Sequence, residues 1–134
     1  MIKRKRTLFI LLLVIILLWM SNLYIWNNRS VFVGDKTKTS DCYMLQIEEM
    51  NQTDSHVLIL EKNDVLSVEY SIEKGKLDFY IGQENERPIY RGNDIAGGKF
   101  EVIIQKKGAY QISVKAKHAS GNISIIVNSG EDEY

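Results

Sequence analysis

The chain has 134 residues, which suits one domain rather than two. Lysine and arginine together match aspartate and glutamate at 17 each, but residues 3–6 are all basic, so the remainder of the chain is mildly acidic. A protein that binds phosphate backbones needs a basic face, and we therefore expect no nucleic-acid partner.

The first predicted element is a membrane-spanning helix over residues 7–26. Only Thr7, Ser21 and Asn22 are polar in this segment, and none of its side chains is charged. A helix rises about 1.5 Å per residue, so a segment of this length crosses the roughly 30 Å of membrane hydrocarbon. Backbone groups in lipid must find their hydrogen bonds within the segment, which requires a helix there.

The flanking charges predict how this helix is oriented. Residues 3–6 form a basic cluster just before it, and such clusters stay on the cytoplasmic side. We expect residues 1–6 in the cytoplasm, the C-terminal domain outside it, and the helix as an uncleaved signal anchor in the cell membrane. The alternative, a cleaved signal peptide, requires a small-x-small cleavage site, whereas residues 19–24 offer bulky side chains.

A polar segment follows the helix. Residues 27–41 show no sustained periodicity, and we interpret them as a linker. Cys42 comes next and is the single cysteine of the chain, so it cannot form an intramolecular disulfide. We expect a small, partly buried apolar residue at the start of the first strand, and a disulfide to a second chain remains the open alternative.

Residues 42–130 show the alternation of apolar and polar side chains that is typical of half-buried strands. Segments rich in Gly, Asn and Asp separate the alternating runs and favour turns. Without an amphipathic helix, this spacing predicts an all-β domain, an antiparallel, jelly-roll-like β-sandwich of about eight strands. The expected strands cover residues 43–50, 57–60, 66–73, 77–81, 88–91, 100–104, 110–116 and 123–127, before an acidic tail at 131–134.

Two segments of this domain carry a resemblance to known families. Residues 60–66, Leu-Glu-Lys-Asn-Asp-Val-Leu, read as strand, turn and strand, and residues 108–114, Gly-Ala-Tyr-Gln-Ile-Ser-Val, open a late strand with Gly-x-Tyr. In these features the domain resembles small secreted β-sandwiches of the pre-peptidase C-terminal and GOLD types. It departs from eukaryotic GOLD proteins, which have paired cysteines and a C-terminal membrane span. The N-terminal anchor and the Lys-, Ile- and Asn-rich composition look like those of envelope proteins of low-GC Gram-positive bacteria. The resemblance implies an accessory or binding role and carries no catalytic residue.

No pattern in the sequence predicts catalysis, a metal site or a cofactor. The two histidines, His56 and His118, are far apart in the chain, and Ser120 near His118 lacks an orienting partner. Zinc ligands at short spacing are absent. Three aspartates near predicted turns form no Asp-x-Asp-x-Asp calcium loop: Asp64, Asp78 and Asp94. We therefore expect a non-enzymatic protein.

Four residues have unexpected positions in their predicted strands. Ile103 and Ile126 fall on the polar sides of theirs, which predicts a patch that docks a protein partner at or near the membrane. Tyr80 also falls on a polar side, and Tyr90 lies at an edge beside a proline. Their rings could offer flat contact area to a sugar or peptide. The sequence thus predicts a binding or accessory module, with a carbohydrate- or envelope-ligand-binding or sensor domain as the alternative. Isolated exposed apolar residues without a function are the simplest third explanation.

Overall fold

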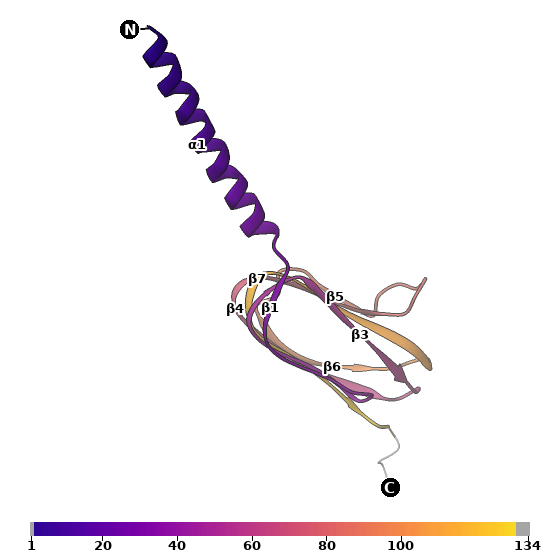
Figure 1. Ribbon diagram of the computed structural model, residues 1–134. Coiled ribbons are helices and arrows are strands. Elements are labelled where there is room, and N and C mark those ends of the chain that lie inside the picture. Colours follow the sequence, from indigo (N-terminus) through magenta and orange to yellow (C-terminus); the bar gives the residue numbers. More distant parts are fainter. Residues whose placement is uncertain (1, 131–134) are drawn as a thin grey trace.

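The computed structural model describes residues 2–130 as one long helix followed by an antiparallel β-sandwich (Figure 1). This confirms the predicted fold class. Met1 and the predicted acidic tail, residues 131–134, lie outside the described residues. The helix is α1 (Ile2–Asn28), and the strands are β1 (Val31–Lys38), β2 (Cys42–Asn51), β3 (Thr53–Leu60), β4 (Val65–Gly82), β5 (Tyr90–Gly92), β6 (Gly97–Ile103) and β7 (Gly108–Asn128).

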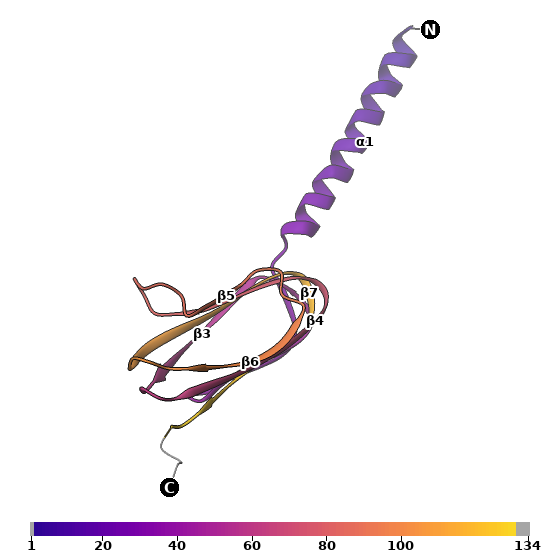
Figure 2. The same cartoon turned by 180° about the vertical axis from the view of Figure 1, so that it is seen from behind.

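The helix α1 projects away from the sandwich, and none of its residues is buried (Figures 1 and 2). It extends beyond the predicted span, residues 7–26, at both ends. The basic residues before that span continue the helix because lysine and arginine are good helix formers. Within residues 2–130, α1 alone has the length and apolar composition to cross a membrane, and an N-terminal signal sequence has the same properties.

Two long strands, β4 and β7, run through both layers of the sandwich. They pair in antiparallel register from Val65 opposite Asn128 to Gly82 opposite Gln111. The first half of β4 and the second half of β7 join β1, β2 and β6 in what we name the first sheet. The other halves join β3 and β5 in the second sheet. The layers are therefore continuous with each other where β4 and β7 bend (Figures 1 and 2).

These bends lie where the sequence predicts turns. Gly75 in β4 and His118 in β7 have positive φ angles of 71° and 46°, and the pairing register shifts between Ile72 and Lys76. The chain kinks there but stays paired, so four expected strands merge into two. The eight expected strands thereby become six, and β1, which was not expected, makes the total seven. A bulge and a true turn favour the same residue types, because both require a residue that can adopt φ > 0. The sequence alone therefore does not distinguish a bend within one strand from a turn between two strands.

The predicted linker contains a strand that alternation did not indicate. Residues 31–38 pair with β2 along their whole length as β1, from Val31 opposite Asn51 to Lys38 opposite Tyr43. Only Val31 and Phe32 of β1 are half-buried, and the other residues of this strand are exposed. An edge strand that buries so little lacks the apolar period that marks a half-buried strand.

The core lies between the two sheets and uses the faces that the alternation predicts. Its side chains come from both sheets, and most of them are fully inaccessible to solvent. Burying such residues supplies the main favourable term in folding. The core residues are Tyr43, Leu45, Ile47, Met50, Leu58, Leu60, Leu66, Val68, Leu77, Phe79, Ile81, Ile104, Tyr110, Ile112, Val114, Ala116, Ala119, Ile123 and Ile125.

Candidate functional site

The structure places Ile103 and Ile126 on the same outer face of the first sheet. Val65 of β4 lies directly opposite Ile103 of β6. Two residues further along the same side of β4, Ser67 lies opposite Ile126 of β7, and Ile126 also lies opposite Cys42 of β2. Residues paired across strands share a face, as do residues two apart in one strand. We name Ile103, Val65, Ile126 and Cys42 the apolar row.

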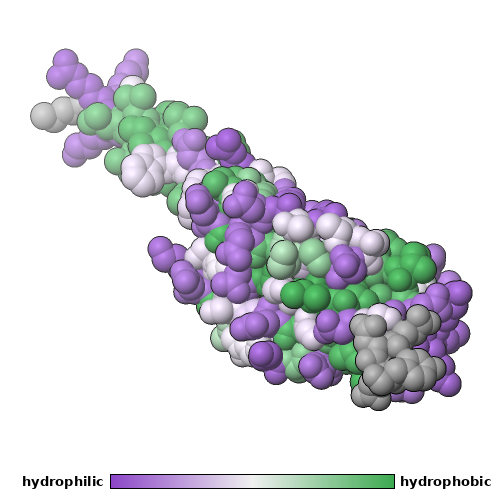
Figure 3. Space-filling model, turned by 90° about the horizontal axis from the view of Figure 1, so that it is seen from below, coloured by the Kyte–Doolittle hydropathy of each residue, from purple (hydrophilic) through white to green (hydrophobic). Residues whose placement is uncertain are grey.

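The apolar row is accessible to solvent. Ile103 is 57% exposed and Ile126 is 43% exposed, while Val65 and Cys42 are half-buried. Cys42 has the partial burial expected from sequence, and it forms no disulfide within the described residues. The row lies at the end of the sandwich far from α1, because β2 runs from Cys42 beside the row to Asn51 beside the end of the helix. Figure 3 shows this distal end, where apolar surface is visible among polar side chains.

The rings of Tyr80 and Tyr90 do not lie on one surface. The expectation that both rings are available to a ligand is wrong for Tyr90. Tyr90 of β5 pairs with the buried Ile81 and so faces inward. Its ring packs 5.2 Å from the ring of Phe79 and 4.5 Å from that of Phe100. The short strand β5 carries too little alternation in sequence to show which face Tyr90 takes.

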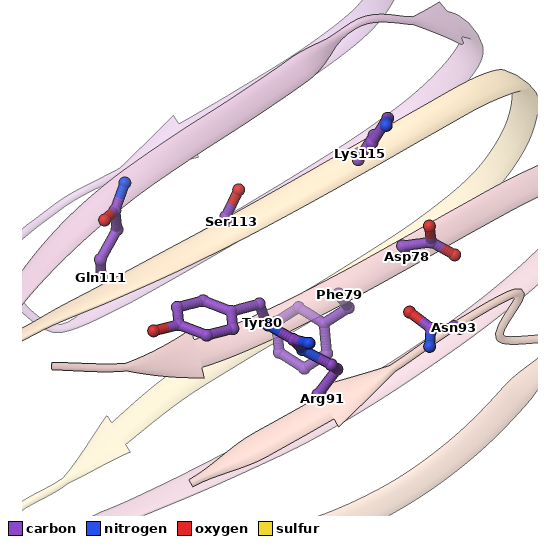
Figure 4. Close-up of a pocket in the computed structure, with 8 residues that line it drawn as sticks. All are labelled: Asp78, Phe79, Tyr80, Arg91, Asn93, Gln111, Ser113 and Lys115. Atoms are coloured by element: carbon purple, nitrogen blue, oxygen red, sulfur yellow. The ribbon is translucent and has the colours of Figure 1, made fainter. Parts of the chain in front are cut away.

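Tyr80 faces outward on the second sheet and borders a depression of about 440 Å³ (Figure 4). Figure 4 shows its ring lying along β4, with Ser113 and Lys115 on the neighbouring β7 and Arg91 on β5. We name this the Tyr80 depression. The residues that line it are Asp78, Phe79, Tyr80, Arg91, Asn93, Gln111, Ser113 and Lys115.

Two further exposed apolar residues occupy the second sheet, at positions that no pattern in the sequence marks as exposed. Val57 and Ile59 of β3 are 54% and 66% exposed. They fall within the apolar run Val57–Leu60, where alternation cannot separate the inward from the outward positions. Their exposure is thus a property that only the pairing of β3 with β7 reveals.

The end of α1 makes specific contacts with the sandwich that sequence patterns do not indicate. The Trp26 ring stacks on the His118 ring with centroids 4.6 Å apart. Asn51 Nδ2 donates hydrogen bonds to the carbonyl oxygens of Asn27 and Arg29, at 3.1 Å and 2.8 Å, and Asn51 Oδ1 accepts one from the His118 N–H at 3.2 Å. These contacts join the helix to the bend of β7.

The histidines and turn aspartates have structural roles. His56 Nε2 lies 2.6 Å from the Thr39 carbonyl oxygen, and among the described residues the His118 ring has no hydrogen bond to Ser120. Asp64 Oδ2 accepts the Glu61 N–H at 2.9 Å, which closes a turn. Within residues 2–130, no three His, Cys, Asp or Glu side chains are placed to hold a metal ion together.

Comparison with known proteins identifies weak structural neighbours and no family. No protein-family model matches the chain, and no curated protein matches it in sequence. One similar structure is PliG of Aeromonas hydrophila, a periplasmic lysozyme inhibitor of g-type lysozyme, with 12% identity over 66% of this chain and 87% of that chain and a TM-score of 0.48. Another is BtGH115A, a family GH115 4-O-methyl-α-glucuronidase with specificity for decorated arabinogalactans, with 12% identity over 78% of this chain and 17% of that chain and a TM-score of 0.36. Similarities at this level assign no function to this chain.

Proposed function

We propose that the protein is a non-enzymatic, membrane-anchored module that binds a protein partner outside the cytoplasm through the apolar row. The observation that carries this proposal is the exposure of two isoleucines, Ile103 and Ile126, on one sheet face with Val65 between their strands. Exposed apolar residues that gather on one face mark interaction sites, whereas single ones do not.

The anchor defines where such a partner must be. In this proposal α1 is an uncleaved signal anchor with its N-terminus in the cytoplasm. The strand β2 runs from the apolar row to the end of α1, and its length at about 3.3 Å per residue places the row roughly 30 Å from the helix end. A partner in the same membrane therefore needs an extracytoplasmic portion that extends far enough from the membrane to reach the apolar row. Confinement to one membrane raises the effective concentration of both proteins, so a small contact area is sufficient.

The charges beside the apolar row indicate the chemistry of the partner surface. Glu101 lies opposite Ser67 on the same face as the row, and it forms no ion pair with any residue in the described part of the chain. A complementary surface has an apolar centre and a basic residue at its rim. The partner is therefore expected to carry a lysine or arginine next to its apolar contact.

Crosslinking in intact cells, followed by purification of the full-length protein, tests this proposal. The test variant is Ile103→Ser with Ile126→Ser. The matched control is Val57→Ser with Ile59→Ser, which removes the same kind of exposed side chain from the second sheet. We expect the test variant to reduce recovery of the crosslinked partner by about tenfold or more, since each 1.4 kcal/mol of binding free energy is a factor of ten. The control should retain the partner.

The charge reversal Glu101→Lys provides an independent check. It removes no apolar area, yet it should weaken partner recovery because a basic rim would then face a lysine. Thermal unfolding must show that all variants remain folded. Equal recovery of the same proteins with the test variant, its control and the wild type would overturn the proposed docking role.

A further inference from the structure

The second sheet presents an aromatic ring that is held flat against the sheet. Tyr80 is followed two residues later by Gly82, and a Cβ atom placed on Gly82 would lie 2.6 Å from the Tyr80 hydroxyl oxygen. The ring therefore covers the glycine, which leaves its other side directed away from the sheet (Figure 4). Arg91 lies near this ring, with its guanidinium carbon 5.8 Å from the ring centroid. This distance lies within the roughly 6 Å of a cation–π contact. The Arg91 side chain is exposed, so a ligand that stacks on the ring displaces the guanidinium from it.

The polar side chains around this ring are available for hydrogen bonds to a ligand. Within residues 2–130, the side chains of Gln111, Ser113 and Asn93 make no hydrogen bond, and Lys115 makes no ion pair. Gln111 and Ser113 lie on the same face of β7, opposite Gly82 and Tyr80 of β4. They supply hydroxyl and amide groups that both donate and accept hydrogen bonds beside the ring.

The charge around the depression is unbalanced in favour of cations. Arg91 and Lys115 are both among the lining residues. Asp78 is the one acidic lining residue. It lies opposite Lys115, and its Oδ1 accepts the Asp94 N–H at 2.7 Å, so the lining keeps one cation in excess. This cationic character contrasts with the mildly acidic composition of the domain as a whole. A ligand that carries both a negative charge and hydroxyl groups would therefore suit the cationic side chains and the polar groups beside the ring.

We infer that the Tyr80 depression binds an acidic saccharide, with one sugar ring stacked on Tyr80 and its carboxylate near Arg91 and Lys115. The apolar face of a sugar suits an aromatic ring that offers flat contact area, and its hydroxyl groups suit Gln111 and Ser113. The volume of about 440 Å³ falls in the range of small-ligand sites, which is roughly 300–1,000 Å³. The polar lining favours a saccharide over an apolar ligand. This site is on the opposite sheet from the apolar row and does not depend on the proposed protein partner.

Titration of the full-length protein in nanodiscs of zwitterionic lipid tests the inference. The probes are oligogalacturonate, which carries carboxylates, and maltohexaose, which is neutral; inorganic phosphate serves as a charge-only probe. We expect oligogalacturonate to shift the NMR signals of Gln111 and Ser113 and to bind at least about tenfold more tightly than maltohexaose. Added salt should weaken binding because the charges are exposed. Phosphate at the same concentration should leave these signals unchanged.

Single substitutions separate the stacking and charge contributions. Tyr80→Ala should reduce oligogalacturonate affinity by about tenfold, whereas Tyr80→Phe retains the ring and should keep most of it. Gly82→Ala displaces the ring through its new Cβ and should also reduce affinity. Lys115→Gln should reduce the preference over maltohexaose, because Arg91 remains, while Lys99→Gln on the first sheet is the matched control and should leave the preference unchanged.

The outcomes that overturn the inference are specific. They are no shift with oligogalacturonate, the same shifts with phosphate alone, equal binding of maltohexaose, or unchanged affinity in a folded Tyr80→Ala protein. The Ile103→Ser and Ile126→Ser variant should bind oligogalacturonate normally. Failure of the saccharide site and failure of the protein-docking proposal are therefore distinguishable.

Discussion

The hydroxyl of Tyr43 on β2 donates a hydrogen bond of 2.6 Å to Asp54 Oδ2 on β3, and so joins the two sheets of the sandwich. Lys36 and Lys38 of β1 reach the same carboxylate at 3.1 Å and 3.0 Å. The Asp54 side chain is only 10% exposed. Burial alone would raise the pKa of Asp54, but the hydrogen bonds from Tyr43, Lys38 and Lys36 outweigh it and hold this pKa below its ordinary value. Burial and the contact with Asp54 raise the pKa of Tyr43.

Asp54→Asn should therefore lower the free energy of unfolding at neutral pH by about 1.5–3 kcal/mol, the usual contribution of hydrogen bonds to a charged group. A depressed folded-state pKa means that this contribution is complete above the unfolded value of about 3.9 and is lost as the pH falls through the folded value. Denaturant unfolding of both proteins from neutral pH into the acid range measures it. The exposed Asp35 of β1 gives the control Asp35→Asn, which should change little. A deficit in Asp54→Asn that persists unchanged in strong acid would contradict the charge-based explanation.

The bend of β4 should not tolerate a side chain at Gly75. This residue has φ of 71°, and an added Cβ would collide with the carbonyl group of His118 in the neighbouring β7. Strain and collision together should make Gly75→Ala cost at least about 3 kcal/mol of unfolding free energy, or prevent folding. The matched control is Gly97→Ala in β6, where the nearest atom to the new Cβ is the Tyr70 carbonyl oxygen at 3.7 Å. Thermal unfolding should show the control at or slightly above wild-type stability, and equal losses in both variants would rule out this role for the bend.

The junction between α1 and the sandwich should depend on Asn51. Its side chain holds two carbonyl groups at the helix end and the backbone N–H of His118. Asn51→Ala leaves that N–H without its partner, so amide hydrogen exchange at His118 should accelerate by about tenfold or more, equivalent to about 1.4 kcal/mol. Gln46→Ala on the same strand is the control, because the Gln46 side chain makes no hydrogen bond among the described residues. Unchanged exchange at His118 would show that the junction does not order this bend.

Cysteine labelling in intact cells tests the expected orientation. Cys42→Ser removes the native thiol, after which Lys62→Cys, in the exposed turn between β3 and β4, should react with a membrane-impermeant maleimide. Lys5→Cys should react only after lysis, because the positive-inside rule places it in the cytoplasm. Intact mass of the labelled protein reports whether the N-terminus is retained. Labelling of Lys5→Cys in unbroken cells, or a mass without α1, would contradict an uncleaved signal anchor.

The strand faces could be predicted from the sequence wherever a strand is half-buried along its length. Leu77, Phe79 and Ile81 alternate with Asp78 and Tyr80, and the structure buries the first three residues as expected. The edge strand β1 was not predicted, because its pairing with β2 buries almost none of its side chains and its sequence therefore shows no apolar alternation. The exposure of Val57 and Ile59 was not predicted, because Leu58 and Leu60 beside them are apolar too and the run shows no alternation.

The sequence by itself determined the apolar helix α1, the inward faces of the strands and the outward placement of Ile103, Ile126 and Tyr80, since each follows from a period within one short segment. The tertiary structure alone decided that Ile103 and Ile126 share a sheet face and that Tyr90 turns inward while Tyr80 borders a depression. Those relationships depend on the register between strands that are distant in the chain, and a slip of one residue would send every side chain of a strand to the other face.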